Sequence, residues 1–249
     1  MTDNLTTTVL YPDGKTESGT LDVISEHVLN VIINGQPSLK LVCTAENLDE
    51  LVMGRLLTDG FIRSADDVDK MVFCSEKTSV RVFLNNEVKL EDRINTDKTC
   101  CTGNKVYMTN LNAESLQHLP DVKIVPEYVF GLTSEFAKGS KLHDATKGNH
   151  VCILASCGKT LFMSEDIGRH NAVDKVVGYA LFNRISLADC MLFISGRVPV
   201  DMVEKVIAAG VPVLVSKSVP TKESAELARK YGLKLVCRAW PDKCDIIVS

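Results

Sequence analysis

The chain has 249 residues, of which 45% are apolar and 24% charged, and its formal net charge is −4. This length and apolar content allow one large domain or two modest ones with proper cores, and the lack of a basic excess argues against a nucleic-acid or membrane-surface binder. No apolar run approaches the roughly 18–20 residues that span a bilayer. Residues 1–4 lack the features of a secretory signal. We therefore expect a cytoplasmic protein that contacts neither nucleic acid nor membrane.

Nine cysteines are many for a chain of this size. In a reducing compartment they should be free thiols rather than a disulfide framework. Cys152 and Cys190 lie inside apolar runs, which predicts buried structural thiols at both positions.

Residues 1–125 are predicted to form a smaller, β-rich α+β domain. Strand signals fill residues 1–40, with a hairpin turn at Asn34-Gly35. A helical pattern opens at Thr44 and ends near Gly60. Two more strands follow at 71–73 and 80–84.

The segment 91–105 is almost entirely polar and contains Cys100 and Cys101. Lys98 and Lys105 flank the two cysteines, and a thiol near cations in a polar loop has a lowered pKa. We therefore predict a mobile loop with nucleophilic cysteines at about 95–105, the alternative being two incidental surface thiols. A metal site is disfavoured, because adjacent cysteines lack chelating spacing and no histidine is close.

Residues 126–249 alternate between short apolar strands and amphipathic helices. The strands are expected at 151–155, 161–164, 191–194, 213–215, 233–236 and 246–248. Alternation of this kind predicts an α/β fold with a mostly parallel sheet and right-handed crossovers.

Three loops should meet at the carboxyl ends of these strands, where ligands of such sheets bind. They span 165–169, 195–199 and 216–221, and each carries a cation: Arg169, Arg197 or Lys217. The sequence therefore predicts a pocket for a phosphorylated ligand, although no Walker or Gly-x-Gly-x-x-Gly motif is present.

The stretch 164–175 combines a strand end, a tight polar turn and a helix start. Gly168 allows close approach of a ligand, and Arg169 at a helix N-terminus suits an anion. An ordinary helix start, with Asp166 as its cap and Arg169 in solvent, is the alternative reading.

Residues 165–175 (Glu-Asp-Ile-Gly-Arg-His-Asn-Ala-Val-Asp-Lys) closely resemble the most characteristic motif of the FdhD family, the formate dehydrogenase accessory sulfurtransferases. The likeness extends to 49–62, 195–197 and 216–221. It also includes 146–150, where Lys147 replaces the first glycine of the family's Thr-Gly-Gly-x-His element. The match follows nearly the whole chain in order.

The resemblance implies a cytidine-deaminase-like C-terminal domain at 126–249 and a homodimer. It also implies that the protein takes sulfur from a cysteine desulfurase as a cysteine persulfide. That sulfur would pass to the bis-molybdopterin guanine dinucleotide cofactor before its insertion into formate dehydrogenase. A guanine nucleotide should mimic this cofactor.

Cys100 falls at the family's persulfide position, the first of a Cys-x-x-Cys motif whose second position is Gly103 here. Either one cysteine suffices or Cys101 serves as partner. Because adjacent cysteines form a strained disulfide, we predict that Cys100 alone carries the sulfur.

The resemblance places cofactor contacts in the segment 238–243 near the C-terminus. The loops add residues suited to phosphates, and the two histidines, His150 and His170, are either ligand contacts or satisfied polar groups. The predicted cofactor-binding residues are Arg238, Ala239, Trp240, Pro241, Asp242, Lys243, Gly168, Arg169, His170, Ser195, Arg197, Lys217, Ser218 and His150.

Two other functions compete with this reading. A zinc nucleoside deaminase would share the fold class but needs His-x-Glu and Pro-Cys-x-x-Cys, and His150 is followed by Val151-Cys152; we therefore expect no zinc. A chaperone that binds the molybdenum cofactor without moving sulfur is the stronger alternative, because the cysteine motif is altered.

Overall fold

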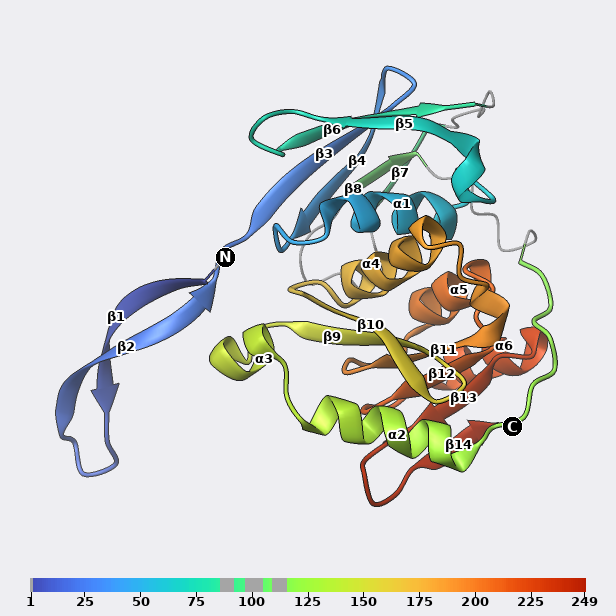
Figure 1. The fold of residues 1–249 in the computed structure, drawn as a ribbon. Helices are drawn as coiled ribbons and strands as arrows, with labels where there is room; N and C mark the ends of the chain where they lie inside the picture. Colours follow the sequence, from blue (N-terminus) through green and yellow to red (C-terminus); the bar gives the residue numbers. More distant parts are fainter. Residues whose placement is uncertain (1, 86–91, 97–104, 109–115) are drawn as a thin grey trace.

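A computed structural model of the chain describes residues 2–85, 92–96, 105–108 and 116–249. Within these residues it contains two six-stranded sheets with helices between and outside them, and a separate two-stranded arm (Figure 1). No helix among the described residues is long and apolar enough to cross a membrane.

The N-terminal sheet has the strand order β5-β6-β3-β4-β8-β7. Asn34 (φ 47°) and Gly35 (φ 83°) form the predicted hairpin turn, since a two-residue turn of this type needs positive φ at both positions. Helix α1 (Leu48–Thr58) covers the inner face. The strands are β3 (His27–Ile33), β4 (Gln36–Cys43), β5 (Val68–Phe73), β6 (Ser79–Leu84), β7 (Asp92–Thr96) and β8 (Lys105–Met108). Strand β7 corrects our expectation that 91–105 is loop throughout, while Cys100 and Cys101 lie outside the described residues.

The C-terminal sheet has the order β10-β9-β11-β12-β13-β14 and is mixed, so the prediction of a mostly parallel sheet is wrong. The central strands β11, β12 and β13 are parallel, whereas β10, β9 and β14 pair antiparallel with their neighbours. The two-residue turn Cys157-Gly158 joins β9 to β10, and a connection this short links only antiparallel strands. The bounds are β9 (His150–Ser156), β10 (Lys159–Asp166), β11 (Cys190–Ile194), β12 (Val213–Ser216), β13 (Lys234–Cys237) and β14 (Asp245–Val248).

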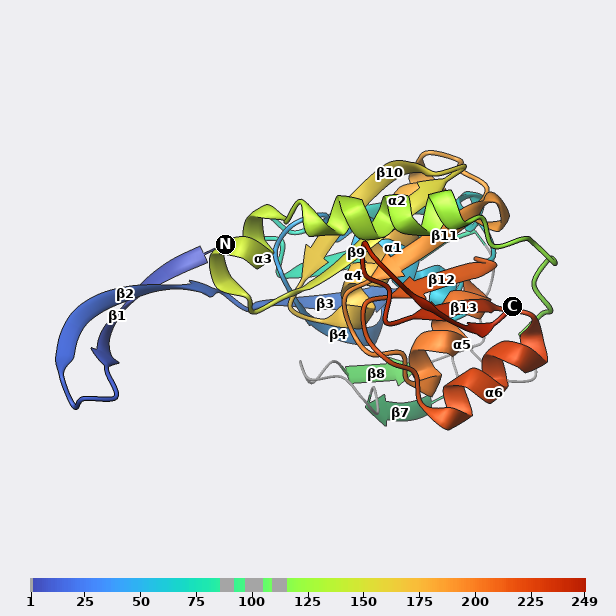
Figure 2. The same ribbon diagram turned by 90° about the horizontal axis from the view of Figure 1, so that it is seen from below.

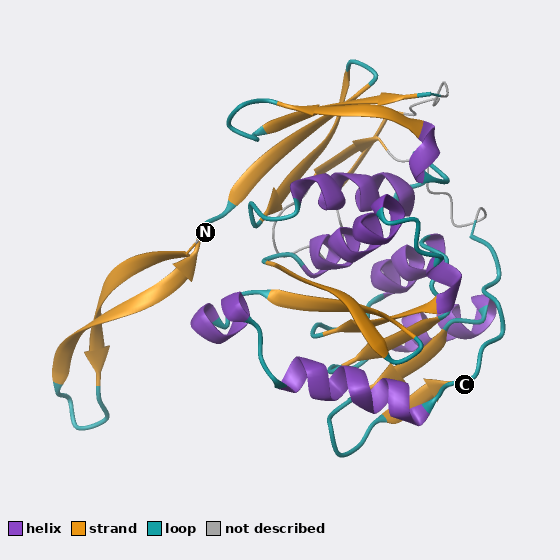
Figure 3. Cartoon of the chain, viewed as in Figure 1, coloured by secondary structure: helices purple, strands orange, loops and turns teal. Residues whose placement is uncertain are grey.

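Helices lie on both sides of this sheet (Figure 3), and alternating side chains of its strands face the two helical layers. Leu154 and Leu192 pack against α4 (Arg169–Phe182), α5 (Val200–Ala208) and α6 (Lys222–Tyr231). Ile153 and Phe193 face the opposite side, which is covered by α2 (Pro126–Ala137). The short helix α3 (Lys141–Thr146) follows α2.

The two halves meet where α1 crosses α4 (Figure 1). A Cβ atom added to Gly54 would lie 1.9 Å from the Asp174 carbonyl oxygen, and one on Gly178 would lie 1.9 Å from that of Glu50. The helices therefore touch backbone to backbone at these two glycines.

The arm consists of β1 (Thr2–Leu10) and β2 (Thr16–Ile24), which pair with each other alone. It stands away from the two sheets in both views (Figure 1 and Figure 2).

Candidate functional site

The candidate site lies at the edge of the C-terminal sheet where β11, β12 and β13 end. Backbone hydrogen bonds join the loops there: the Lys217 N–H donates to the Ile194 carbonyl (3.1 Å), and the Ala239 N–H donates to the Ser216 carbonyl (3.0 Å). His150 begins β9 at the same edge, paired with Asp166 at the end of β10. The structure thus brings the predicted loops together, along with the segment 238–243.

Gly196 lies against both His150 and Arg169. A Cβ on Gly196 would lie 3.2 Å from His150 Nδ1, which is tighter than ordinary contact, and 3.5 Å from Arg169 Cβ, which is ordinary van der Waals contact. Burial and the Arg169 guanidinium lower the pKa of His150, which keeps its ring neutral at pH 7. Arg169 is only 7% exposed, which excludes the reading of a solvated arginine.

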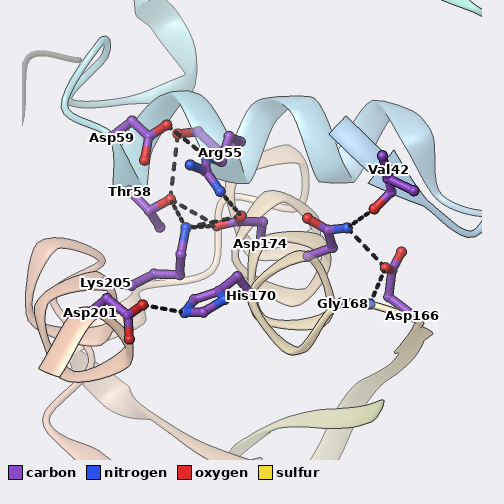
Figure 4. A network of polar contacts seen from close by, with 11 residues as sticks. Val42, Arg55, Thr58, Asp59, Asp166, Gly168, His170, Asp174, Asp201 and Lys205 are labelled. Carbon is purple, nitrogen blue, oxygen red and sulfur yellow. Dashed lines mark hydrogen bonds and ion pairs between the residues drawn. The ribbon is translucent and has the colours of Figure 1, made fainter. Parts of the chain in front are cut away.

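His170, the next residue of α4, faces a different neighbour. Its Nε2 lies 3.4 Å from Asp201 Oδ2 on α5 (Figure 4). His170 is 3% exposed, so it is a buried polar residue that links α4 to α5.

Two serines hold the loops rather than pointing to an open site. Ser195 Oγ accepts from the Val151 N–H (3.0 Å). Ser216, which we did not single out as a site residue, donates its hydroxyl to the Gly196 carbonyl (2.8 Å) and accepts from the Ser218 N–H (3.0 Å). Nothing in the local pattern separates Ser216 from any serine that ends a strand.

Lys217 places its ammonium near two aromatic rings, 4.9 Å from the centroid of Trp240 and 5.2 Å from that of Phe136. Trp240 remains 43% exposed. Phe136 comes from α2, about 80 residues earlier in the chain, and sequence reasoning missed it for that reason. The Lys217 ammonium thus lies over the ring of a partly exposed tryptophan beside the loop edge.

The segment 238–243 forms a tight turn at this edge. The Trp240 N–H donates to the Lys243 carbonyl (2.8 Å), and the Lys243 N–H donates back (3.3 Å). Arg238 forms an ion pair with Asp245, while Ala239 is buried and Pro241, Asp242 and Lys243 are exposed. Arg197 is also exposed on its own loop.

Most of the other polar residues of 165–175 serve the join between the two halves. Lys175 Nζ pairs with Asp166 Oδ2 (2.7 Å) and donates to Thr44 Oγ1 (2.7 Å). The Asn171 side chain donates to the Val42 carbonyl (2.8 Å) and to Asp166 (2.9 Å). The N-cap of α4 is Gly168, whose N–H donates to Asp166 (2.8 Å).

A second buried cluster extends this join to α5 (Figure 4). Lys205 Nζ lies 2.8 Å from Asp174 Oδ1, and the Thr58 hydroxyl donates to the same oxygen (2.7 Å). Arg55 Nη1 lies 3.8 Å from Asp174 Oδ2, and Asp174 itself is fully buried. Of 165–175, Arg169 is the residue whose side chain lies against the loop edge, beside Gly196.

The described cysteines divide into two groups. Cys152 and Cys190 are buried as predicted, and burial raises the pKa of both thiols, that of Cys190 to about 11. Cys74 is exposed, and hydrogen bonds from Ser79 and Thr78 lower the pKa of its thiol to about 6. Among the described residues, no group of three histidine, cysteine or acidic side chains could hold a metal ion.

The family model and the similar proteins found by comparison all point to the same family. The model of the FdhD/NarQ family matches residues 24–248. The sulfur carrier protein FdhD of Bacillus subtilis (strain 168) is 30% identical over 230 residues, covering 91% of this chain and 88% of that protein. Its namesake from Staphylococcus aureus (strain MRSA252) is 29% identical over 233 residues, covering 92% and 88%.

The fold also matches a solved structure. A protein from Desulfotalea psychrophila, described as a formate dehydrogenase accessory protein, superposes with a TM-score of 0.80 at 22% identity. The match covers 100% of this chain and 97% of that one.

Proposed function

Because the chain belongs to the FdhD/NarQ family, we propose that it is a sulfur carrier that serves formate dehydrogenase. Cys100 takes a sulfur from a cysteine desulfurase and delivers it to the bis-molybdopterin guanine dinucleotide cofactor, which binds as cargo at the loop edge. The observation that carries the proposal is that Arg169, Lys217 and Trp240 lie at one edge of the sheet, since cations suit phosphates and an exposed indole suits a purine.

The loading step needs no oxidant. The Cys100 thiolate attacks the terminal sulfur of the desulfurase persulfide, a new S–S bond forms, and the desulfurase thiolate leaves. Gly103 at the second motif position excludes the usual Cys-x-x-Cys pair, so the persulfide stays on Cys100 until delivery.

Mass spectrometry after incubation with a cysteine desulfurase and cysteine tests this step. We expect one added sulfur on Cys100, removable by reductant and absent from Cys100→Ala. Cys74→Ala is the matched control, because Cys74 is an exposed thiol with a lowered pKa and would collect sulfur if loading were unspecific. Sulfur on Cys101 would keep the function and move the carrier residue.

The altered motif favours a second candidate, a chaperone that binds the molybdenum cofactor without transferring sulfur. In that case neither cysteine is loaded, yet a guanine nucleotide still binds at the loop edge. A variant with both Cys100→Ala and Cys101→Ala would then still support a sulfur-dependent formate dehydrogenase, which a sulfur carrier at either cysteine forbids.

A further inference from the structure

The N-terminal sheet has an outer face that none of the described helices covers (Figure 1). Alternate residues of β3, among them Leu29 and Val31, are buried in the core that α1 covers, so Ile32 between the core positions points outward. By the same alternation Val72 and Phe83 lie on the outer face, where they are 49% and 37% exposed. Apolar side chains that gather on an exposed face are typical of an interaction site.

Cations lie among these apolar side chains. Arg81 of β6 is paired with Val72 of β5 on one side and with Ile32 of β3 on the other. Lys70 is paired with Phe83, and its Nζ lies 4.8 Å from the centroid of that ring. Together with Lys40 of β4, these residues form what we call the outer patch: Ile32, Lys40, Lys70, Val72, Arg81 and Phe83.

The charge of the outer patch says what kind of partner fits it. Strands β3 to β6 contain three lysine or arginine residues and one acid, Asp69. The chain as a whole has a net charge of −4, so this face is basic on an acidic protein. Charge complementarity therefore favours a protein partner whose contact surface is acidic and partly apolar.

The same sheet also carries the predicted sulfur carrier. Lys40 is paired with Lys105 of β8, and Lys105 is paired with Thr96 of β7. Residues 97–104, which include Cys100, connect these two paired residues. Four residues of chain extend at most about 14 Å, so a protein that lies over Lys40 is within reach of the connection that contains the cysteine.

The cargo site belongs to the other half of the molecule. Helices α1 and α4 lie between the N-terminal sheet and the C-terminal sheet, whose loop edge we propose for the cofactor (Figure 1). A protein bound on the outer patch therefore leaves the loop edge uncovered. This placement favours the molecule that gives the sulfur over the one that receives it.

We propose that the outer patch is the docking surface of the sulfur donor, and that the donor presents an acidic, partly apolar surface beside its persulfide cysteine. The inference rests on the proposed function, because it names the place where the donor of that function binds. Attraction between the two charged surfaces speeds their encounter and orients the donor toward Cys100. The exchange that follows is the one described above, in which the desulfurase thiolate leaves as the new S–S bond forms.

Direct binding to a cysteine desulfurase tests the surface without any sulfur transfer. The desulfurase is immobilised, cysteine is left out, and surface plasmon resonance gives the affinity of the full chain. Lys70→Glu/Arg81→Glu reverses two charges of the outer patch. Lys123→Glu/Lys159→Glu is the matched control, because both lysines are exposed and lie outside the N-terminal sheet.

We expect the patch variant to bind at least about 10-fold more weakly than wild type at 0.1 M salt, and the control variant to bind like wild type. The difference should shrink at 1 M salt, where the Debye length falls from about 10 Å to about 3 Å. Lys70→Arg/Arg81→Lys keeps both charges and should keep the affinity. Circular dichroism, and loading of Cys100 by glutathione persulfide, a small donor that needs no docking surface, check that each variant is folded and reactive.

The outcomes separate this inference from the proposed function. Equal affinity of wild type and the patch variant, or no binding of the desulfurase by wild type, overturns the docking surface. A patch variant that loses self-association in sedimentation velocity but keeps its affinity for the desulfurase also overturns it, because a second copy of the chain then covers this face. Binding that depends on the outer patch without sulfur on Cys100 supports the surface and refutes sulfur transfer instead.

Discussion

Trp240 offers a direct test of the loop edge at the level of one residue. It is the single tryptophan of the chain and is 43% exposed beside the Lys217 ammonium. Stacking of a base on an aromatic ring contributes about 1–3 kcal/mol, so Trp240→Ala should weaken GDP binding by about 5- to 150-fold, and Trp240→Phe by less. Isothermal titration calorimetry measures this. Equal affinity for wild type and Trp240→Ala would place the base elsewhere.

The lowered pKa of His150 predicts that the free energy of unfolding decreases at acid pH. Its pKa is lowered in the folded state by burial and by Arg169, so below about pH 6.5 the unfolded chain binds more protons there than the folded chain. Stability is then lost as pH falls, by at most about 1.4 kcal/mol per pH unit for one proton. Urea unfolding between pH 7.5 and 5 should show a shallower pH dependence for His150→Gln, and no such change for exposed His118→Gln.

The crossing of α1 and α4 makes a prediction for whole elements. Gly178→Ala would drive a methyl group into the Glu50 carbonyl, so the helices must separate, at a cost of about 3 kcal/mol or more. Gly131→Ala is the matched control, because this glycine lies in the exposed face of α2 with its nearest neighbour 3.9 Å away. There alanine should stabilise by about 0.5–1 kcal/mol. Chemical unfolding gives both values, and equal effects would contradict the close crossing.

The buried ion cluster between the two halves predicts that two lysine substitutions differ in their cost to stability. Lys205→Met removes the ammonium from Asp174, which is fully buried, and breaking a buried pair costs about 3–5 kcal/mol. Lys138→Met breaks the exposed pair with Glu135 and should cost less than about 1 kcal/mol. If Lys205→Met changes the thermal or urea midpoint as little as Lys138→Met does, then other groups balance the negative charge of Asp174.

At the scale of the molecule, local sequence patterns predict where helices and strands lie better than they predict whether neighbouring strands are parallel or antiparallel. The strand predicted at 191–194 and the helix start predicted within 164–175 reappear as β11 and α4. The strands predicted at 151–155 and 161–164 are too close in sequence for a helical crossover, and the structure joins them antiparallel through the turn Cys157-Gly158. The burial of Asp174 depends on Thr58, more than 100 residues earlier, and no local signal reports such a pairing.

The buried join also predicts how the whole chain unfolds. Residues 1–125 and 126–249 are predicted to form two domains. Helices α1 and α4 join these halves through their glycine contacts and the buried Arg55–Asp174 ion pair, and Lys175 donates to Thr44, so separating the halves would expose Asp174 and Lys175. We therefore expect one cooperative transition. Trp240 fluorescence reports the C-terminal half, and alkylation of Cys43, whose burial raises its thiol pKa to about 12, reports the N-terminal half. The two midpoints in urea should coincide. Labelling of Cys43 at a urea concentration clearly below the Trp240 midpoint would mean that the halves unfold separately. The buried ion pairs would then connect two domains that are each stable alone.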